Sequence, residues 1–274
     1  MSNQREPGVC IFCDKDHTDG HKLSGEHLWP QWIKKILPIG PENRHSSLPI
    51  SYGRVGDAVF IEPDYIQRTG NAAGRKIKVP CTQCNNGWMS RIENEARPIL
   101  TPLIVGDNAT ISTEDQKKIA AWAALRTIII EFDDPSTIAV SPTMRKQIAK
   151  DGEPDSNWDV WIGTLRKAEN RNFVHHGAAA APPITLLFAD PKTMAKNTQT
   201  TAIILGRLYL LTFSTFMPAV RDVLKIPAGS AAALRKVWPA QSEIQAPIEP
   251  QLTKNMANEA SYAFIGNAAA LPGL

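Results

Sequence analysis

The most regular pattern of apolar and polar positions in the chain lies between residues 112 and 132. Apolar side chains recur there at intervals of three and four residues, which is the period of a helix buried along one side. Ser112 begins the segment and Asp115 stands three residues later, as in a capping box. The apolar stripe consists of Ile119, Trp122, Ala123, Leu125, Ile129 and Ile130, and it ends near Phe132. We predict a capped, buried helix that packs the N-terminal part of the chain onto the C-terminal part.

After residue 157 the pattern changes to alternating and continuous runs of β-forming residues. These runs cover residues 158–165, 184–188, 201–205 and 208–216, and turns that contain Pro, Asn or Gly separate them. Short apolar runs bounded by turn residues are typical of strands. Residues 135–274 are therefore predicted to form a mixed, mainly antiparallel β domain. His175 and His176, next to a run of alanines, are interpreted as residues at a strand end.

The N-terminal part of the chain is less regular. Residues 38–70 hold several prolines and glycines around short apolar runs, which predicts an irregular insertion. Basic and apolar residues alternate over 75–79, as in a strand. A helix is predicted from Cys84 to about Ala96, where Pro98 stops it. Residues 1–97 are thus expected to form a first domain, followed by a linker and the capped helix over 98–134.

All four cysteines of the chain belong to two Cys-x-x-Cys pairs, Cys10 with Cys13 and Cys81 with Cys84. Each two-residue spacer lets one tight turn present two sulfur atoms to the same ion, and four thiolates in a tetrahedron make a structural zinc site. A redox pair or a chance arrangement is the alternative, but two identical spacings with no further cysteine favour Zn²⁺. The ion would add stability that a small domain with few strands cannot obtain from its own core.

Glu26 and His27 lie between the two cysteine pairs, and Asn85 directly follows Cys84. Two apolar residues and a proline follow His27. Over residues 8–95 this order resembles the HNH family of nucleases, whose active site is a ββα-metal finger. In such proteins a His ends the first strand of a hairpin, and the second cysteine pair opens the helix that packs across the hairpin.

The resemblance implies a role for each matching residue. His27 corresponds to the general base, Glu26 to the first acidic metal ligand and Asn85 to the metal ligand on the finger helix. The family usually has an Asn about five residues before the second cysteine pair, which orients the base. Lys76 occupies that position here, so the chain departs from the family pattern, and Asn71 is the nearest upstream Asn for the role.

These residue types suit the hydrolysis of a phosphodiester. The reaction needs an activated water and a cation that stabilises negative charge on the leaving 3′ oxygen. Glu26 and Asn85 supply oxygen atoms, the ligands that Mg²⁺ or Mn²⁺ prefers, and the His27 imidazole accepts a proton near neutral pH. The alternative for Glu26 and His27 is the exposed start of a helix, in which His27 is incidental.

Composition agrees with a folded protein, at 43% hydrophobic and 21% charged residues. A length of 274 residues is sufficient for two domains. The chain has no apolar run long enough to span a membrane, and its first residues are too polar to begin a signal peptide. We therefore expect no membrane partner. Zinc thiolates without an export signal indicate a cytoplasmic protein.

The net charge of +3 is modest, but basic residues gather near the second cysteine pair. Between Tyr65 and Ile92 there is no acidic residue, and the basic residues are Arg68, Arg75, Lys76, Lys78 and Arg91. Part of this charge offsets a zinc ion held by four thiolates, and the remainder is available to phosphates. Arg75, Lys76, Lys78 and Arg91 are the candidate nucleic-acid contacts; a solvated basic face is the alternative.

The expected fold class is α+β, with an N-terminal ββα-metal zinc finger, a connecting helix and a C-terminal mainly antiparallel β domain. The expected function is that of a metal-dependent, HNH-like endonuclease that hydrolyses DNA, with structural Zn²⁺ and catalytic Mg²⁺ or Mn²⁺. The alternative is a non-catalytic zinc-binding module that interacts with DNA or with a protein. Residues 135–274 show no Gly-rich phosphate loop, no nucleophilic Ser elbow and no paired carboxylates near a His.

Overall fold

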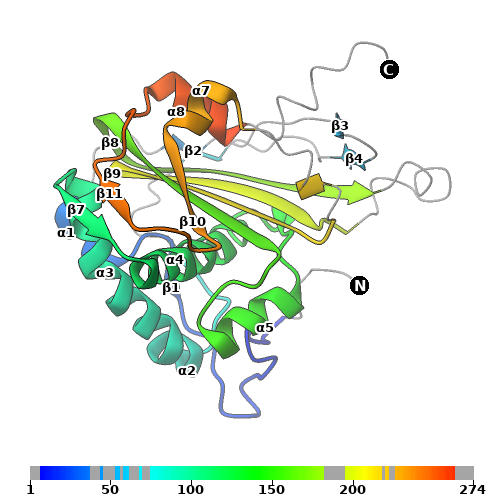
Figure 1. Ribbon diagram of the computed structural model, residues 1–274. Helices are drawn as coiled ribbons and strands as arrows, with labels where there is room; N and C mark the ends of the chain where they lie inside the picture. The colour runs from blue at the N-terminus through cyan, green and yellow to red at the C-terminus, as the bar shows by residue number, and fades with distance from the viewer. Residues whose placement is uncertain are drawn as a thin grey trace.

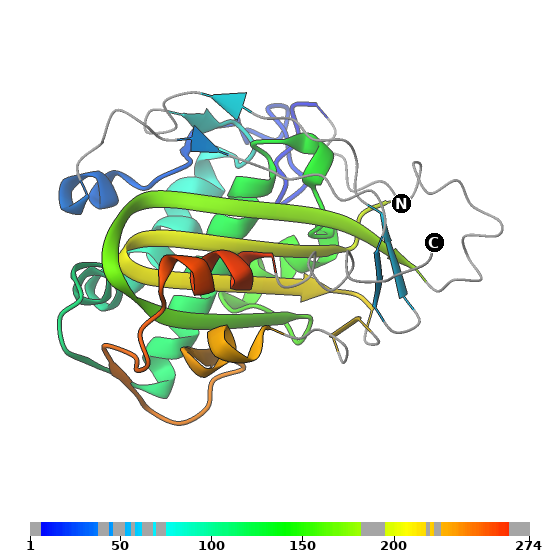
Figure 2. The same cartoon turned by 90° about the horizontal axis from the view of Figure 1, so that it is seen from above.

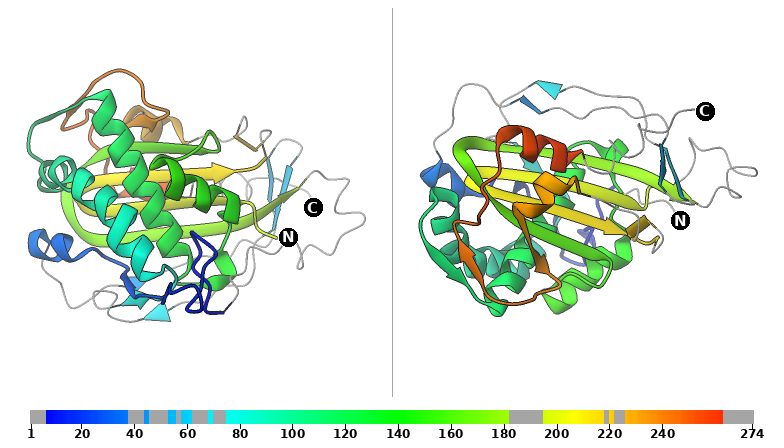
Figure 3. Two further views of the ribbon diagram at one scale, coloured as in Figure 1. Left: turned by 90° about the horizontal axis from the view of Figure 1, so that it is seen from below. Right: turned by 45° about the horizontal axis from the view of Figure 1, so that its top comes forward.

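The computed structural model describes residues 7–37, 75–181, 195–217, 220–221 and 226–262, together with the backbone of four short strands between residues 44 and 69. An antiparallel sheet forms the middle layer (Figure 1). The helices α3, α4 and α5 cover one face of this sheet, and α7 and α8 cover the other (Figure 3). The protein is therefore a mixed α and β structure with antiparallel sheets, as the sequence predicts.

The elements follow one another from short strands to long helices and then to long strands. In the first part they are β1 (Glu26–His27), α1 (Gln31–Ile36), β2 (Arg44–His45), β3 (Gly53–Val55), β4 (Ala58–Ile61), β5 (Arg68–Thr69), β6 (Lys76–Ile77), α2 (Thr82–Cys84), a π-helix (Asn85–Met89), α3 (Ser90–Val105), β7 (Ala109–Ile111) and α4 (Thr113–Glu131). In the second part they are a 3-10 helix (Pro135–Thr137), α5 (Pro142–Asp151), β8 (Trp158–Ala181), β9 (Thr198–Thr215), α7 (Ala228–Ala232), β10 (Leu234–Trp238), β11 (Ile244–Ala246) and α8 (Lys254–Ser261).

The long strands β8 and β9 form a two-stranded ribbon that is bent back on itself (Figure 2). The pairing runs from Trp158 opposite Ser214 to Ala178 opposite Thr198, with register shifts at Glu169. The two halves of β9 lie beside each other, since the hydroxyls of Thr198 and Thr215 are 2.8 Å apart. The predicted strands over 158–165, 201–205 and 208–216 lie within this ribbon. The run over 184–188 and most of the insertion over 38–70 lie outside the described residues.

The turn in the middle of β9 requires a glycine. Gly206 has a φ of 58°, in the left-handed region, and a Cβ there would lie 2.3 Å from the backbone oxygen of Ile104. A side chain at this position would be strained and would clash with the end of α3. The close approach lets the last turn of α3 pack directly on the bent ribbon.

The predicted capped helix is confirmed as α4. The Ser112 Oγ atom accepts a hydrogen bond from the Asp115 backbone N–H at 3.1 Å, and the Asp115 carboxylate accepts one from the Ser112 N–H at 3.2 Å. Every residue of the helix from 119 to 131 is buried. A helix surrounded by apolar contacts on all sides is a core element rather than a surface one. The helix lies between α3 and the sheet, with α5 also against it (Figure 3).

One cluster of buried apolar side chains joins the two ends of the chain. It runs from Cys10 and Leu28 through Trp122 on α4 to Leu210 on β9. The division into residues 1–97, 98–134 and 135–274 stays a prediction, but its first boundary falls inside α3 and its two larger parts contribute to the same core.

The predicted stop of the finger helix at Pro98 is wrong. Helix α3 continues to Val105 and contains both Pro98 and Pro102. An internal proline removes one helical hydrogen bond, yet the buried face of the helix continues past both prolines through Ala96, Leu100 and Leu103. Burial of these side chains outweighs the lost bonds.

His175 and His176 are not strand-end residues, because both lie inside β8 and are buried. The His175 Nδ1 atom is 2.7 Å from the Thr201 hydroxyl, and the His176 ring is 5.5 Å from the Tyr262 ring, centre to centre. Burial lowers the pKa of His175 to about 4 and that of His176 to about 3. Both imidazoles are therefore neutral at physiological pH.

Acid should destabilise the fold through these two histidines. The unfolded chain binds a proton at each imidazole below a pKa of about 6.5, whereas the folded chain does not, so stability is lost as the pH falls from that value. We expect a loss of up to about 1.4 kcal/mol per pH unit for each histidine. Urea unfolding near pH 7 and near pH 5 would measure it. His176→Phe should reduce the slope, while the exposed His17→Asn should not; equal slopes in all three proteins would contradict the assignment.

Candidate metal centre and active site

The four cysteines meet at one point between the N-terminal loop and the start of α2. Cys10 and Cys13 lie in a turn, Cys81 caps the N-terminus of α2, and Cys84 ends that helix. The four sulfur atoms all lie within 4.8 Å of one another. Cys10 and Cys81 are completely buried, and Cys13 is half-buried. The predicted set of thiols is brought together and forms a possible metal-binding site.

Backbone groups support the sulfur atoms. The Cys81 N–H donates to the Cys10 Sγ at 3.2 Å, and the Cys84 N–H donates to the Cys81 Sγ at 3.4 Å. The hydrogen bond from the Cys84 thiol lowers the pKa of Cys10 to about 4, whereas burial raises the pKa of Cys13 to about 11. Four adjacent thiols cannot all lose their protons unless a cation offsets the charge. The donor set and its spacing fit a tetrahedral thiolate site.

His21 also contacts the cysteines. Its Nδ1 atom lies 3.3 Å from the Cys81 Sγ and 3.6 Å from the Cys13 Sγ. A zinc–nitrogen bond measures about 2.1 Å, so these distances describe an imidazole beside the thiols. No spacing in the sequence distinguishes His21 from His17, which is exposed.

Metal content should depend on the cysteine cluster. We expect about one tightly bound zinc ion per chain. Cys10→Ser and Cys84→Ser should each lose the ion and unfold the segment around it, because metal binding free energy contributes to folding. Elemental analysis and circular dichroism would test this, with His17→Ala as the matched surface control. A purified, folded protein that retains no metal under metal-replete conditions would contradict the expectation.

His27 lies at the end of β1, paired with β6. Glu26 stands opposite Ile77, and His27 stands opposite Lys76. The His27 Nε2 atom is 2.8 Å from the Nε2 atom of Gln31, the first residue of α1. Because the Gln31 amide nitrogen can only donate, the imidazole accepts through Nε2. Gln31 therefore orients His27, a role that no motif in the sequence indicates; Asn71 lies outside the described residues.

Burial and the nearby positive charges favour the neutral form of His27. Burial has the largest effect, and the positive charges of Lys34 and Lys76 add to it, so that the pKa of His27 lies below its usual value. A neutral imidazole is the form that accepts a proton. Because Nε2 accepts a hydrogen bond, the proton of the neutral ring lies on Nδ1, and Nε2 carries the one lone pair that can accept a further proton.

A buried arginine on α4 holds Glu26. The Arg126 Nη1 atom donates to the Glu26 Oε1 at 2.8 Å and to the His27 backbone oxygen at 3.2 Å. Its Nη2 atom lies 3.4 Å from the Glu93 Oε1 on α3. Arg126 is 1% exposed, and burial raises the pKa of Glu93. Neither Arg126 nor Glu93 can be found from the sequence motif, because both lie far along the chain from His27.

Asn85 is joined to the strand side of the site by its amide. The Asn85 Nδ2 atom donates to the Ser24 Oγ at 3.0 Å, two residues before Glu26. This leaves the amide oxygen available for another contact. Asn85 lies at the start of the π-helix, whose Gly87 has non-helical backbone angles. The structure thus places Glu26, His27 and Asn85 on adjacent elements.

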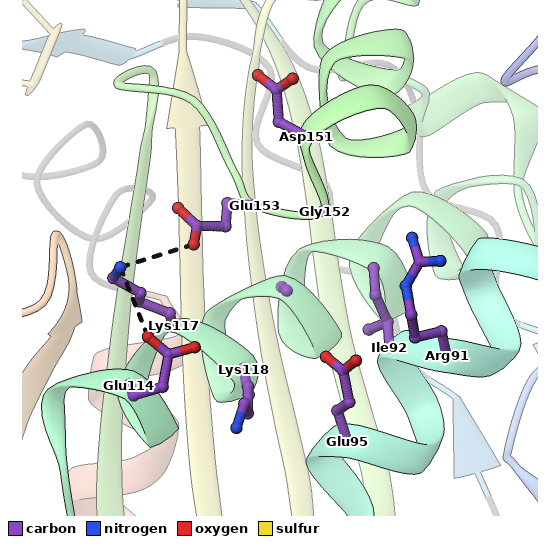
Figure 4. Close-up of a pocket in the computed structure, with 10 residues that line it drawn as sticks. Arg91, Ile92, Glu95, Glu114, Lys117, Lys118, Asp151, Gly152 and Glu153 are labelled. Carbon is purple, nitrogen blue, oxygen red and sulfur yellow. Dashed lines mark ion pairs between the residues drawn. The ribbon is translucent and has the colours of Figure 1, made fainter.

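The four predicted phosphate contacts have different environments. Arg75 forms an ion pair with Asp133 and donates from Nη2 to the Asp133 backbone oxygen at 3.1 Å. Lys76 is exposed opposite His27, and Lys78 is exposed on the same segment. Arg91 instead lines a pocket between α3, α4 and the end of α5 (Figure 4).

The pocket that Arg91 lines carries charges of both signs. Its acidic side chains include Glu95, Glu114, Asp151 and Glu153. The ammonium group of Lys117 lies 3.6 Å from Glu114 and 3.8 Å from Glu153, as the dashed lines in Figure 4 show. Opposite charges that are already paired do not select either an anion or a cation.

Comparisons with protein-family models, with curated protein sequences and with solved structures each found no match for the chain. Within the segments that the structure describes, no helix is both long enough and apolar enough to span a bilayer.

Removing Arg126 should cost far more than removing an exposed cation. Arg126→Met leaves Glu26 and Glu93 facing each other without a counter-charge, and breaking a buried ion pair in this way costs about 3–5 kcal/mol. Lys117→Met is the control, because its pairs with Glu114 and Glu153 are exposed and each is worth less than about 1 kcal/mol. Urea unfolding of both variants measures the loss in the free energy of unfolding. An equally small loss in both would show that the ion pairs of Arg126 do not stabilise the fold.

Proposed function

We propose that the protein is a metal-dependent, HNH-like endonuclease that hydrolyses DNA, with His27 as the general base. The observation that carries the proposal is the arrangement around His27. A short antiparallel strand pair holds His27 and Glu26, a helix that starts at the cysteine cluster holds Asn85, and Gln31 orients the imidazole. Two strands and a helix held by a thiolate metal site are the parts of a ββα-metal finger.

The chemistry assigns a separate task to each side chain. His27 takes a proton on Nε2 from a water molecule that displaces the Gln31 N–H, and burial together with the neighbouring cations favours the neutral imidazole that this step needs. The oxygen atoms of Glu26 and Asn85 would hold Mg²⁺ or Mn²⁺, which supplies positive charge to the scissile phosphate. The four thiolates would hold Zn²⁺, which fixes the start of the helix. Such thiolate chemistry suits a cytoplasmic protein.

Glu26 can bind a metal only while its carboxylate also accepts the hydrogen bond from Arg126. One of its carboxylate oxygens, Oε1, accepts from the guanidinium, which leaves Oε2 for a cation. This pairing also favours the second candidate function, a non-catalytic zinc-binding module for DNA or a protein, in which Glu26 serves the fold alone. The two functions differ in their response to a chelator, since a nuclease loses its catalytic cation before the tighter zinc.

His27→Ala should reduce the cleavage of supercoiled plasmid DNA by about two to four orders of magnitude, the usual contribution of a general base. Zinc content and stability should stay near those of wild type, because the thiols and the buried pair of Arg126 are untouched. The assay uses Mg²⁺, Mn²⁺ and EDTA in parallel. His17→Ala, which changes an exposed histidine four residues after Cys13, is the matched control.

Variants of the candidate ligands complete the design. Asn85→Ala should raise the Mg²⁺ or Mn²⁺ concentration needed for cleavage. Glu26→Gln is preferred to Glu26→Ala, because the amide keeps an oxygen for the Arg126 hydrogen bond. If wild type cleaves no DNA with either metal, or if His27→Ala cleaves as fast as wild type, the nuclease proposal fails and the zinc-module function is the better account.

A further inference from the structure

Three basic side chains from three separate elements form a group of positive charges next to His27. One of the three comes from the C-terminal half of the chain. Lys34 lies on α1, Lys76 on β6 opposite His27, and Arg171 on β8. Figure 2 shows α1 beside the bend of the β8–β9 ribbon. Two contacts fix this approach. The Arg171 Nη1 atom donates to the Leu37 backbone oxygen at 3.4 Å, and the Phe173 ring lies 5.9 Å from the Trp29 ring, centre to centre.

Among the residues that the structure describes, the three cations form no ion pair with a carboxylate. Glu26, the acidic residue next to His27, is paired with Arg126. Burial, and then the charges of Arg171 and Lys76, lower the pKa of Lys34. Positive charges held together without compensation favour the binding of an anion.

Arg171 is the most informative of the three. It is 3% exposed, and its Nε and Nη2 atoms are buried without a hydrogen-bond partner among the described residues. An unpaired buried guanidinium is costly, so a folded protein retains one where a ligand or a function compensates. Nε and Nη2 form an edge of the guanidinium that can donate two parallel hydrogen bonds to two oxygens of one phosphate.

The bend of β8 explains why Arg171 departs from the regular ladder. The β8–β9 register shifts between Glu169 and Asn172, so Arg171 occupies an irregular position at the bend of the ribbon. Its neighbour Arg166 on the same strand is exposed. The two arginines are therefore close in sequence but differ in environment, which makes Arg166 a suitable control.

We propose that Arg171, Lys34 and Lys76 form a binding site for a backbone phosphate of the nucleic acid beside His27. The buried Nε and Nη2 atoms of Arg171 become accessible when the phosphate binds and donate to its oxygens, and Lys34 and Lys76 neutralise its charge. The C-terminal sheet thus takes part in substrate binding. This inference rests on the proposed nuclease function for the identity of the ligand, but the anion site itself is testable without cleavage.

The first experiment uses inorganic phosphate as the probe. The melting temperature of the wild-type protein should be higher in phosphate than in chloride at equal ionic strength. This increase should be lost in Arg171→Met and in Lys34→Met. Arg166→Met and the exposed Lys35→Met should keep it. Arg171→Met should be at least as stable as wild type in chloride, since a buried unpaired charge is removed. The proposal is overturned if phosphate does not raise the melting temperature of wild type, or if it raises that of Arg171→Met and Lys34→Met by the same amount.

The second experiment measures DNA binding in the His27→Ala background, where no cleavage interferes. Each lost phosphate contact should reduce the slope of log affinity against log salt by about 0.9. Arg171→Met and Lys34→Met should show this reduction, and Arg166→Met and Lys35→Met should not. Arg171→Lys should keep the slope but weaken binding, because the charge remains while the bidentate grip is lost.

The outcomes separate the two proposals. Loss of the phosphate response in Arg171→Met together with no cleavage by wild type supports the anion site and rejects the nuclease function. The opposite result is cleavage that depends on His27, with a phosphate response and a salt slope that Arg171→Met leaves unchanged. That result supports the nuclease function and overturns the anion site. A loss of stability in Arg171→Met, with binding unchanged, would show that the arginine serves the fold alone.

Discussion

The buried guanidinium of Arg126 is the interaction on which the rest of this structure depends. It reaches from the central helix α4 to a carboxylate and a backbone oxygen on β1 and to a second carboxylate on α3. A strand of two residues has too few ladder bonds to hold a fixed position by itself. The charge of Arg126, placed where water cannot screen it, sets the position of β1 relative to both helices. The position of His27 therefore depends on a residue in the middle of the hydrophobic core.

This dependence shows which features the sequence reveals and which it does not. The helix α4 could be predicted because its capping box and apolar spacing are local signals, and the cysteine cluster because four thiols in two identical pairs have few other uses. The end of α3 could not, since the burial of Leu100 and Leu103 outweighs two prolines and is set by distant packing. The fold alone brings Arg126, Glu93 and Arg171 to the site, so no spacing in the sequence predicts them.

The orientation of His27 illustrates the same limit in another way. The family pattern directs attention to an Asn upstream of the second cysteine pair, yet the hydrogen bond to the imidazole comes from Gln31, four residues after the histidine. The distance of four residues matches one helical turn, but the histidine itself lies on a strand. The chain bends at Leu28 and Trp29, and α1 begins directly after Pro30, so that the two side chains meet.

The nearly continuous helical segment from Thr82 to Val105 links the cysteine cluster to the turn at Gly206. Both ends of this segment are fixed, one by sulfur atoms and the other by a contact that leaves no room for a Cβ atom. Each residue of a helix advances the axis by about 1.5 Å and turns it by about 100°. The insertion or deletion of one residue would therefore rotate one anchored end out of register with the other. In evolutionary terms, this part of the chain can change its residue types far more readily than its length.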